Sequence, residues 1–435
     1  MVEPTPLDYQ SAPPLASSRF YYGWVNLIVA ALAMVATLPG RTLGLALVTE
    51  PLLRDLSLDR VQYATINLWA TLIGATFAVL CGPLIDRFGT RVVVSGVCGL
   101  LGATVVAMSR VHGATGLLVT ATLTRGLGQS ALSVVSIAIV GKWFVRRINL
   151  AMAVYAVLLS IGFMIAFPAV QYAAERAGWR PAWQGVAIGV LAVAVLGWAL
   201  VRSTPESIGL AADAPARKAE PTTPTGWPLR RVLLTPAFWV FALSCAMFNL
   251  VYSGIGLFNE DVLRELGFDS ATFRLLLAVM TMVGLLANFL GGWLGERWPI
   301  NRLMAVAMLM MTAGLLLLPR ARSGSHALAY GALMGVTGGI VTVVFFACWP
   351  RMFGRAHLGK IQGVAQAMTV LASALGPVLV AESKRLTNSY LPLLYWLAPA
   401  VGALGVCAWL IHVPSAGQAD VAEEGGDSAQ PPSPV

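Results

Sequence analysis

The sequence predicts an all-α polytopic membrane protein with twelve transmembrane helices in two six-helix repeats. Hydrophobic residues make up 57% of the 435 residues and charged residues only 11%, less than half of the ~25% typical of soluble proteins. Apolar runs of roughly 18 residues or more recur from Tyr22 almost to His412, and each can cross the ~30 Å hydrocarbon core as a helix. Basic residues gather in alternate loops, as the positive-inside rule requires.

The predicted helices follow the apolar runs in order. The first helix follows the aromatic belt at 19–24 and continues past Pro39 to about Val48. Helices 2 to 6 are predicted at 63–83, 92–109, 115–139, 149–173 and 182–201. Helices 7 to 12 are predicted at 236–258, 273–294, 302–319, 326–348, 361–381 and 391–412. Single Gly and Pro residues in these runs do not oppose the prediction, because membrane helices tolerate them.

Composition divides the chain into two helical bundles, 19–206 and 234–412. Residues 207–233 are rich in Ala, Pro, Thr and charge, which predicts a cytoplasmic linker. The Pro-rich residues 1–18 and the acidic, Ser/Pro-rich residues 413–435 are expected to be disordered cytoplasmic tails.

The net charge of +9 does not indicate a nucleic-acid partner, because the basic residues concentrate in loops on one side of the membrane. Their distribution predicts a multi-pass protein of the plasma (inner) membrane with both termini cytoplasmic. The five cysteines lie dispersed in apolar segments without C-x-x-C spacing, which favours packing over disulfides or metal ligation. We expect a monomer in the lipid bilayer with no cofactor.

The two halves repeat at a nearly constant offset. Residues 54–59 (RDLSLD) match residues 264–269 (RELGFD) at 264 − 54 = 210. Further matches at an offset of 209 are Gly126 with Gly335, Phe144 with Phe353, Arg146 with Arg355 and Pro168 with Pro377. A register kept across charged loops predicts two bundles related by an axis along the membrane normal, with the ligand site near the midplane between them.

Ten residues, 82–91 (GPLIDRFGTR), separate the second and third apolar runs. We expect a tight charged loop here, with Pro83 and Gly89 supplying the bend. Asp86 is expected at the start of the following helix, where a carboxylate meets unsatisfied N–H groups. The pattern G-x-L-x-D-R-x-G-x-R resembles the signature loop of the major facilitator superfamily.

A second resemblance narrows the family. Residues 141–153 (GKWFVRRINLAMA) resemble the G-K-[YW]-F-x-[RK]-R-x-x-A stretch of monocarboxylate transporters and oxalate/formate antiporters. Shorter matches in the expected order are 22–24 (YGW), 178–180 (GWR), 202–206 (RSTPE) and 352–361 (MFGRAHLGKI). The resemblance covers roughly residues 19–412 and implies the major facilitator fold, with transport of a small molecule by alternating access.

Arg41 is the first candidate for substrate binding, because a cation inside a membrane helix is costly and usually faces a cavity or a partner. In the family that this chain resembles, a Lys commonly follows the proline of helix 1, and Arg41 stands two residues after Pro39. The alternatives are an Arg that reaches outward to the membrane surface or one that pairs with Glu50.

Arg125 is the second candidate. It falls near the middle of helix 4, and no acidic residue occurs in helices 2 to 5 to neutralise it. The family's helix 4 motif also places an Arg here. Gln129, one turn on, lies on the same face and extends a polar site. The alternative is an Arg that caps backbone carbonyls of a neighbouring broken helix.

Two cations without a carboxylate at membrane depth favour an anionic substrate, and guanidinium groups match carboxylates in bidentate geometry. We therefore predict a small mono- or dicarboxylate as the substrate. Other polar positions that could line the site are Asn67, Tyr155, Asn249, Tyr252, Asn288 and Gln366. Each of them could equally form an interhelical hydrogen bond.

The chain departs from the family at the pair that couples protons to substrate. Monocarboxylate transporters carry an Asp–Arg pair in helix 8, where this chain has Gly284 and Asn288. Arg itself does not titrate in a useful range. We therefore predict anion exchange or facilitated transport. Proton-coupled efflux of an uncharged or amphiphilic compound, and a transport-dead sensor, are the alternatives.

For the gate, we predict that the charged segment of the first half braces the closed cytoplasmic side, through a charge pair and a helix-end dipole. Its weaker relative in the second half is GWLGER at 292–297. The candidate gating residues are Gly82, Asp86, Arg87, Gly89, Arg91, Glu296 and Arg297.

Overall fold

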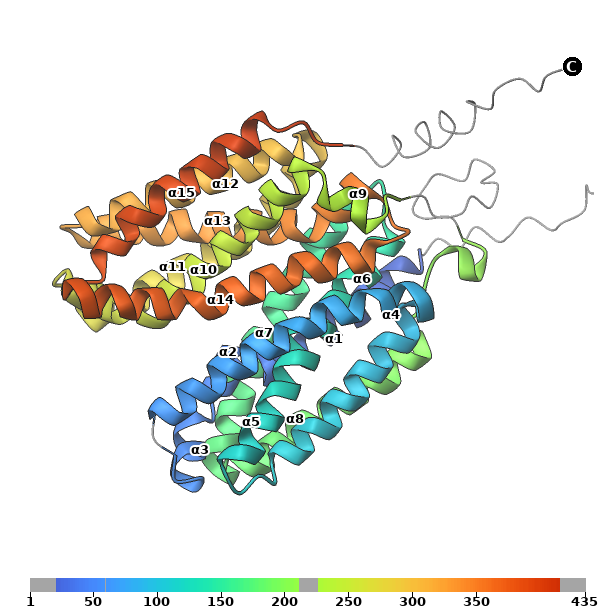
Figure 1. Cartoon of the computed structure of the whole chain (residues 1–435), viewed down its shortest axis with the longest axis horizontal. Coiled ribbons are helices and arrows are strands. Elements are labelled where there is room, and N and C mark those ends of the chain that lie inside the picture. The colour runs from blue at the N-terminus through green and yellow to red at the C-terminus, as the bar shows by residue number, and fades with distance from the viewer. Residues whose placement is uncertain (1–20, 59, 211–225, 415–435) are drawn as a thin grey trace, which may run out of the picture.

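The computed structural model describes residues 21–58, 60–210 and 226–414. All the named secondary-structure elements in these residues are helices (Figure 1). The tails expected at 1–18 and 413–435, apart from residues 413 and 414, lie outside the described residues. So does most of the linker expected at 207–233.

The described residues of the first half form eight α-helices. They are α1 (Gly23–Val35), α2 (Thr42–Ala46), α3 (Thr49–Asp55), α4 (Arg60–Met108), α5 (Ala114–Thr124), α6 (Ser133–Trp143), α7 (Ile148–Ala177) and α8 (Trp179–Leu200). The second half follows the linker. Its helices are α9 (Leu229–Leu233), α10 (Pro236–Glu265), α11 (Ser270–Arg297), α12 (Ile300–Leu317), α13 (Gly324–Phe353), α14 (Leu358–Thr387) and α15 (Leu391–Leu410). Short irregular helices are η1 (Leu38–Gly40), η2 (Arg125–Leu132), η3 (Glu206–Ile208) and η4 (Leu318–Arg320), of which η2 is π-helical.

Eleven helical stretches in the described part of the chain are long and apolar enough to cross a membrane. One of them, Thr65–Met108, has 44 residues, which at 1.5 Å per residue is about twice the hydrocarbon thickness. Its backbone leaves helical geometry at Gly89 (φ 78°, ψ 162°). It therefore makes two crossings, and the predicted architecture of twelve transmembrane helices is confirmed.

The prediction of a loop at 82–91 is wrong. Pro83 and Asp86 lie inside the helical run of α4, and Gly89 alone interrupts it. Membrane helices accommodate an internal proline, and the positive φ of Gly89 turns the chain without a loop. Asp86 therefore precedes the break instead of starting the next helix.

The first transmembrane helix is broken, where the sequence predicts a continuous helix to about Val48. α1 ends at Val35, the chain passes through η1, and Arg41 is extended (φ −92°, ψ 149°) before α2 begins. Pro39 cannot donate a backbone hydrogen bond, so the helix has a weak point here.

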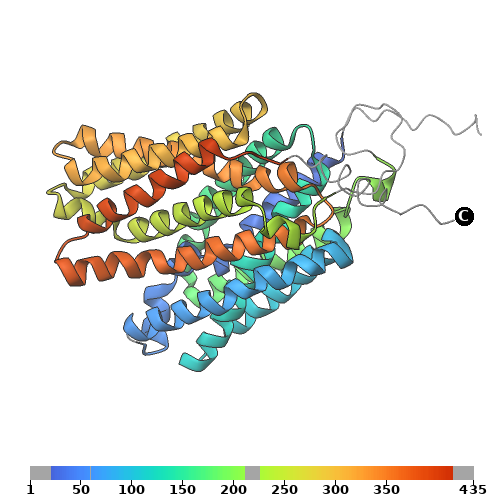
Figure 2. The ribbon, with the colours of Figure 1, turned by 45° about the horizontal axis from the view of Figure 1, so that its top comes forward.

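The two halves lie side by side with their long helices running in a common direction (Figures 1 and 2). Across the boundary between them, α4 and α6 pack against α14, and α7 packs against α11 and α13. One end of the molecule contains the start of α1, the ends of α8 and α15, and the short helix α9 (Figure 1). We call this the linker end, and the opposite end, where α3 lies, the far end.

Candidate functional site

A cavity of about 570 Å³ lies between the two halves, within the ~300–1,000 Å³ typical of small-molecule sites. Its first-half wall is formed by Thr42, Leu45, Thr49, Tyr63, Asn67, Leu68, Thr71, Arg125 and Gln129. Its second-half wall is formed by Phe258, Ser373, Ala374, Pro377, Val378 and Ala381. Thr49 and Tyr63 belong to α3 and the start of α4, so the cavity lies toward the far end.

The broken first helix and the π-helical segment η2 shape the polar wall together. A Cβ at Gly40 would lie 2.3 Å from the Thr124 carbonyl oxygen and 2.9 Å from the Gln129 nitrogen. Only glycine permits this approach of one backbone to another. The close contact brings Thr42, just past the break, next to the first π-helical turn. Functional sites often use such π-helical segments.

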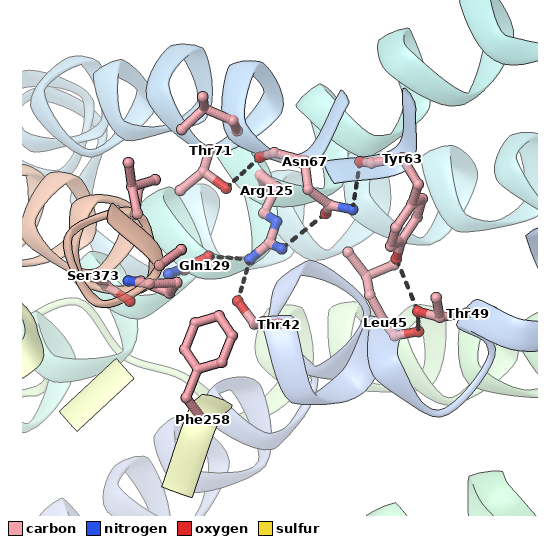
Figure 3. A pocket seen from close by; sticks show the side chains of 15 residues that line it. Thr42, Leu45, Thr49, Tyr63, Asn67, Thr71, Arg125, Gln129, Phe258 and Ser373 are labelled. Atoms are coloured by element: carbon pink, nitrogen blue, oxygen red, sulfur yellow. Dashed lines mark hydrogen bonds between the residues drawn. The ribbon is translucent and has the colours of Figure 1, made fainter. Parts of the chain in front are cut away.

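Arg125 is the centre of this wall (Figure 3). Its Nη1 donates to Thr42 Oγ1 and to Gln129 Oε1, both at 2.9 Å. Its Nη2 donates to Asn67 Oδ1 at 3.0 Å. The three acceptors come from α2, from α4 and from its own helix, so the guanidinium is held in one orientation at the cavity wall.

The positive charge of Arg125 is not neutralised within the described chain. The residue is only 3% exposed, its partners are a hydroxyl and two amides, and no ion pair between described side chains includes it. Its buried Nε has no described acceptor, and such an unpaired donor costs about 1–3 kcal/mol or more when charged. An anion in the cavity would neutralise the charge of Arg125.

Three of the residues predicted from the sequence meet in this cavity: Arg125, Gln129 and Asn67. Arg41 lies outside its lining. Arg41 Nε donates to Thr37 Oγ1 (2.6 Å), and its guanidinium lies 5.2 Å from the centre of the Phe163 ring. Glu50, its alternative partner, has a side chain outside the described residues.

The remaining predicted polar residues also lie outside the lining of this cavity. Tyr155 is fully buried and shares a hydrogen bond with Ser136 Oγ (2.8 Å). Asn249 donates to the Cys245 carbonyl (2.9 Å), and Asn288 is buried with an Oδ1 that has no described donor.

Two further candidates lie elsewhere. Tyr252 is 45% exposed and packs its ring against Phe248. Gln366 is half-buried on α14.

The sequence-based prediction missed several polar lining residues. Tyr63 and Thr71 lie four residues on either side of Asn67, so the helical repeat of this polar stripe could have revealed them. Thr49 Oγ1 is within 3.0 Å of the Tyr63 hydroxyl and belongs to the same polar wall. Thr42 could not be found this way, because the break at 36–41 changes the direction that it faces.

The candidate gating residue Asp86 connects the two halves at the linker end. Its Oδ1 lies 3.6 Å from Lys142 Nζ and accepts a hydrogen bond from the Gly359 N–H at 3.3 Å. Gly359 is in the first turn of α14, where unsatisfied N–H groups and the helix dipole favour a carboxylate. A Cβ at Gly82 would lie 2.6 Å from the Gly359 carbonyl oxygen, so the backbones are in direct contact here.

The neighbouring cations contact their own half. Arg87 is exposed and lies over the Phe88 ring. Arg91 Nε donates to the Trp198 carbonyl at 2.7 Å. A Cβ at Gly89 would lie 2.4 Å from Ser203 Oγ, so this turn is pressed against the end of the first half.

The repeat-related contact in the second half uses a backbone group. The Gly295 carbonyl accepts from Asn149 Nδ2 (2.6 Å), across the halves, and from Arg351 Nη1 (2.8 Å). Glu296 is exposed, and Arg297 lies 3.8 Å from the centre of the Trp293 ring. Both interfaces at the linker end are therefore packed shut, and the cavity lies beyond them.

Two six-helix halves around a cavity with one buried cation are the architecture of a secondary transporter. The profile of the Major Facilitator Superfamily matches residues 27–262 and 250–434, and the chain belongs to this family. It is a multi-pass membrane transporter for a small molecule.

Similar proteins agree with this assignment. Bovine monocarboxylate transporter 13 (Bos taurus) is 24% identical over 330 residues, 74% of each chain. Mouse monocarboxylate transporter 11 (Mus musculus) is 26% identical over 82% of this chain and 80% of its own. The probable nitrate/nitrite transporter NarK2 of Mycobacterium tuberculosis is 24% identical over 75% of this chain and 81% of its own. The predicted family and its monocarboxylate transporter-like branch are confirmed.

A solved structure shares the fold. The proton:xylose symporter XylE, bound to 6-bromo-6-deoxy-D-glucose, superposes with a TM-score of 0.72 over 92% of this chain and 99% of its own, at 15% identity.

Proposed function

We propose that this transporter carries a small organic anion with one carboxylate, by alternating access between the two halves. The observation that carries the proposal is Arg125, a buried cation at the cavity wall with only neutral partners. A guanidinium matches a carboxylate in bidentate geometry. Relatives named for monocarboxylates and for nitrate or nitrite support an anion as the substrate.

The two walls of the cavity favour a monoanion with an apolar body over a dicarboxylate. The polar wall of the first half receives the carboxylate at Arg125. The second-half wall is apolar apart from Ser373, with Phe258, Pro377 and Val378 among its members. A second carboxylate against that wall would be desolvated without a partner, at a cost of several kcal/mol.

We propose that the linker end lies on the cytoplasmic side of the inner membrane, because the positive-inside distribution favours this orientation. The described arrangement is then the outward-facing state. Asp86, Gly82 and Gly359 form the closed cytoplasmic gate on one side, and the Asn149–Gly295 contact forms it on the other. Opening the cytoplasmic side separates both contacts.

We also propose that transport proceeds as anion exchange. The described residues of the cavity lining include no Asp, Glu or His side chain that could carry a proton with the substrate. An empty carrier must close around the unneutralised Arg125, which costs several kcal/mol, whereas a bound anion neutralises it. Exchange is therefore expected to exceed net flux.

The test is flux in proteoliposomes that contain the purified full chain. Labelled monocarboxylates with short apolar bodies are expected to exchange rapidly against unlabelled substrate on the opposite side, without an imposed proton gradient. Arg125→Gln is expected to abolish exchange, and Arg274→Gln, at the exposed start of α11, serves as the control. Uptake that occurs only with a proton gradient would refute the exchange mechanism. Competition by dicarboxylates but not monocarboxylates would refute the substrate class, and absence of any flux would favour a sensor.

A further inference from the structure

Four arginines at the linker end lie over exposed aromatic rings. Arg91 lies 4.7 Å from the centre of the Trp198 ring, and Arg302 lies 5.7 Å from that of Trp409. The other two pairs are Arg87 with Phe88 and Arg297 with Trp293. The four aromatic side chains are 51–55% exposed, although large aromatics are usually well buried.

The first two pairs are equivalent in the two repeats. The offset is 302 − 91 = 211 for the arginines and 409 − 198 = 211 for the tryptophans. Trp198 and Trp409 lie in the last turns of α8 and α15. α8 packs against α4, and α15 packs against α12, on opposite flanks of the molecule (Figure 1). The repeat therefore places one Arg–Trp pair on each outer flank at the linker end.

Each arginine of these two pairs also lies in a first helical turn. Arg91 follows the break of α4 at Gly89, and Arg302 is the third residue of α12. The unsatisfied N–H groups and positive dipole end of a helix start attract an anion. The arginine charge and the helix dipole therefore act at the same place.

These two arginines retain free donors. Arg91 Nε donates to the Trp198 carbonyl, but among the described residues its terminal nitrogens have no acceptor, and neither has the Arg302 guanidinium. Neither forms an ion pair with a described carboxylate. At the far end, Arg180 pairs with Asp55 and Lys384 with Glu265, and the two arginines that lie over aromatic rings without a described ion pair, Arg176 and Arg320, contact tyrosine instead of tryptophan.

We propose that the Arg91–Trp198 and Arg302–Trp409 pairs are two repeat-related binding sites for the headgroups of anionic phospholipids. The phosphate accepts hydrogen bonds from the free guanidinium nitrogens, and the indole lies at the level of the headgroup, where tryptophan is enriched. The proposal rests on the membrane embedding of the fold and is independent of the transported substrate.

The experiment is native mass spectrometry of the full chain in detergent, titrated with phosphatidylglycerol or with phosphatidylcholine of the same acyl chains. The wild-type protein is expected to bind two molecules of phosphatidylglycerol in preference to phosphatidylcholine. Arg91→Gln and Arg302→Gln are each expected to weaken one site about fivefold, as removal of one membrane-surface charge predicts. The double variant is expected to lose the preference at both sites.

The control is Arg264→Gln, which removes a far-end charge already paired with Glu260 and Asp261 and is expected to leave lipid binding unchanged. Arg302→Lys keeps the charge, and its binding of phosphatidylglycerol is measured in the same titration if the Gln variant does not remain monodisperse. The proposal is overturned if the double variant binds phosphatidylglycerol as the wild type does. Equal loss in Arg264→Gln, or equal binding of the two lipids, also overturns it.

Discussion

Replacement of Asp86 by Asn tests whether this carboxylate holds the linker end closed. The change keeps the shape of the side chain and removes its charge. In the closed arrangement the carboxylate contacts Lys142 of its own half and the Gly359 N–H of the other half. The side chains of Asp86 and Lys142 are each only 10% exposed, so solvent screens the pair weakly.

The magnitude follows from these distances. The pair with Lys142 at 3.6 Å lies within the first half, so the Asp86 contact that is lost when the halves separate is the hydrogen bond from the Gly359 N–H at 3.3 Å. A hydrogen bond to a charged group contributes about 1.5–3 kcal/mol net. Asp86→Asn is therefore expected to destabilise the closed linker end by about 2 kcal/mol, which is roughly a 30-fold shift toward the open state.

Cys81 provides a native probe of this opening. It is 2% exposed on α4, one residue before the interface residue Gly82, and its Sγ donates to the Ala131 carbonyl of the first half at 3.5 Å. In a Cys407→Ser background, which removes the exposed thiol, Asp86→Asn is expected to raise the rate of Cys81 alkylation by N-ethylmaleimide about 30-fold. Cys98 is fully buried and should stay unlabelled, which shows that the fold is intact. An unchanged Cys81 rate, or the same increase in the far-end control Asp261→Asn, would refute the reasoning.

Three further predictions concern other parts of the molecule. Gly40→Ala is expected to destabilise the protein by about 1–3 kcal/mol, measured by thermal unfolding, because the new Cβ would meet the Thr124 carbonyl oxygen at 2.3 Å. Phe258→Ala is expected to weaken transport of anions with bulky apolar bodies at least tenfold and to leave that of the smallest carboxylates unchanged, measured as KM in exchange. Burial tends to raise the pKa of Glu265, but hydrogen bonds from Ser389 and Lys384 hold that pKa below its ordinary value. Glu265→Gln should therefore lower Tm at pH 7, and the difference should shrink once the pH falls below the ordinary Glu pKa and vanish below the lowered pKa of Glu265.

The sequence predicts the fold well because the bilayer imposes length and polarity on every crossing. Arg125, Gln129 and Asn67 could also be placed in one site, because a cation at the centre of an apolar helix needs polar neighbours on adjoining helices. The sequence repeat also predicts that the chain forms two equivalent bundles, because matching glycines such as Gly126 and Gly335 mark equivalent positions in both halves.

The local backbone at the site could not be predicted in the same way. The break in the first helix and the π-helical turn depend on the contact of Gly40 with the Thr124 carbonyl and the Gln129 nitrogen. Thr124 is 124 − 40 = 84 residues away from Gly40 in the sequence. Arg41 lies within that break and contacts Thr37 and Phe163, outside the lining of the cavity. The apolar second-half wall gives no sequence signal, because its residues resemble any lipid-facing or packing residue.

The repeat is symmetric in packing but not in chemistry. At the offset of 209 that pairs Gly126 with Gly335, the counterpart of Arg125 is Met334 and that of Gln129 is Gly338. The glycines recur because both halves need close helix packing, whereas the cationic site exists in one half. In the proposed cycle, directional hydrogen bonds fix the carboxylate on the first half, while the second-half wall, apolar apart from Ser373, makes mainly non-directional contacts with its body. The second half can then rock across the bound anion without breaking a hydrogen bond to it, which lowers the cost of the change between the two states.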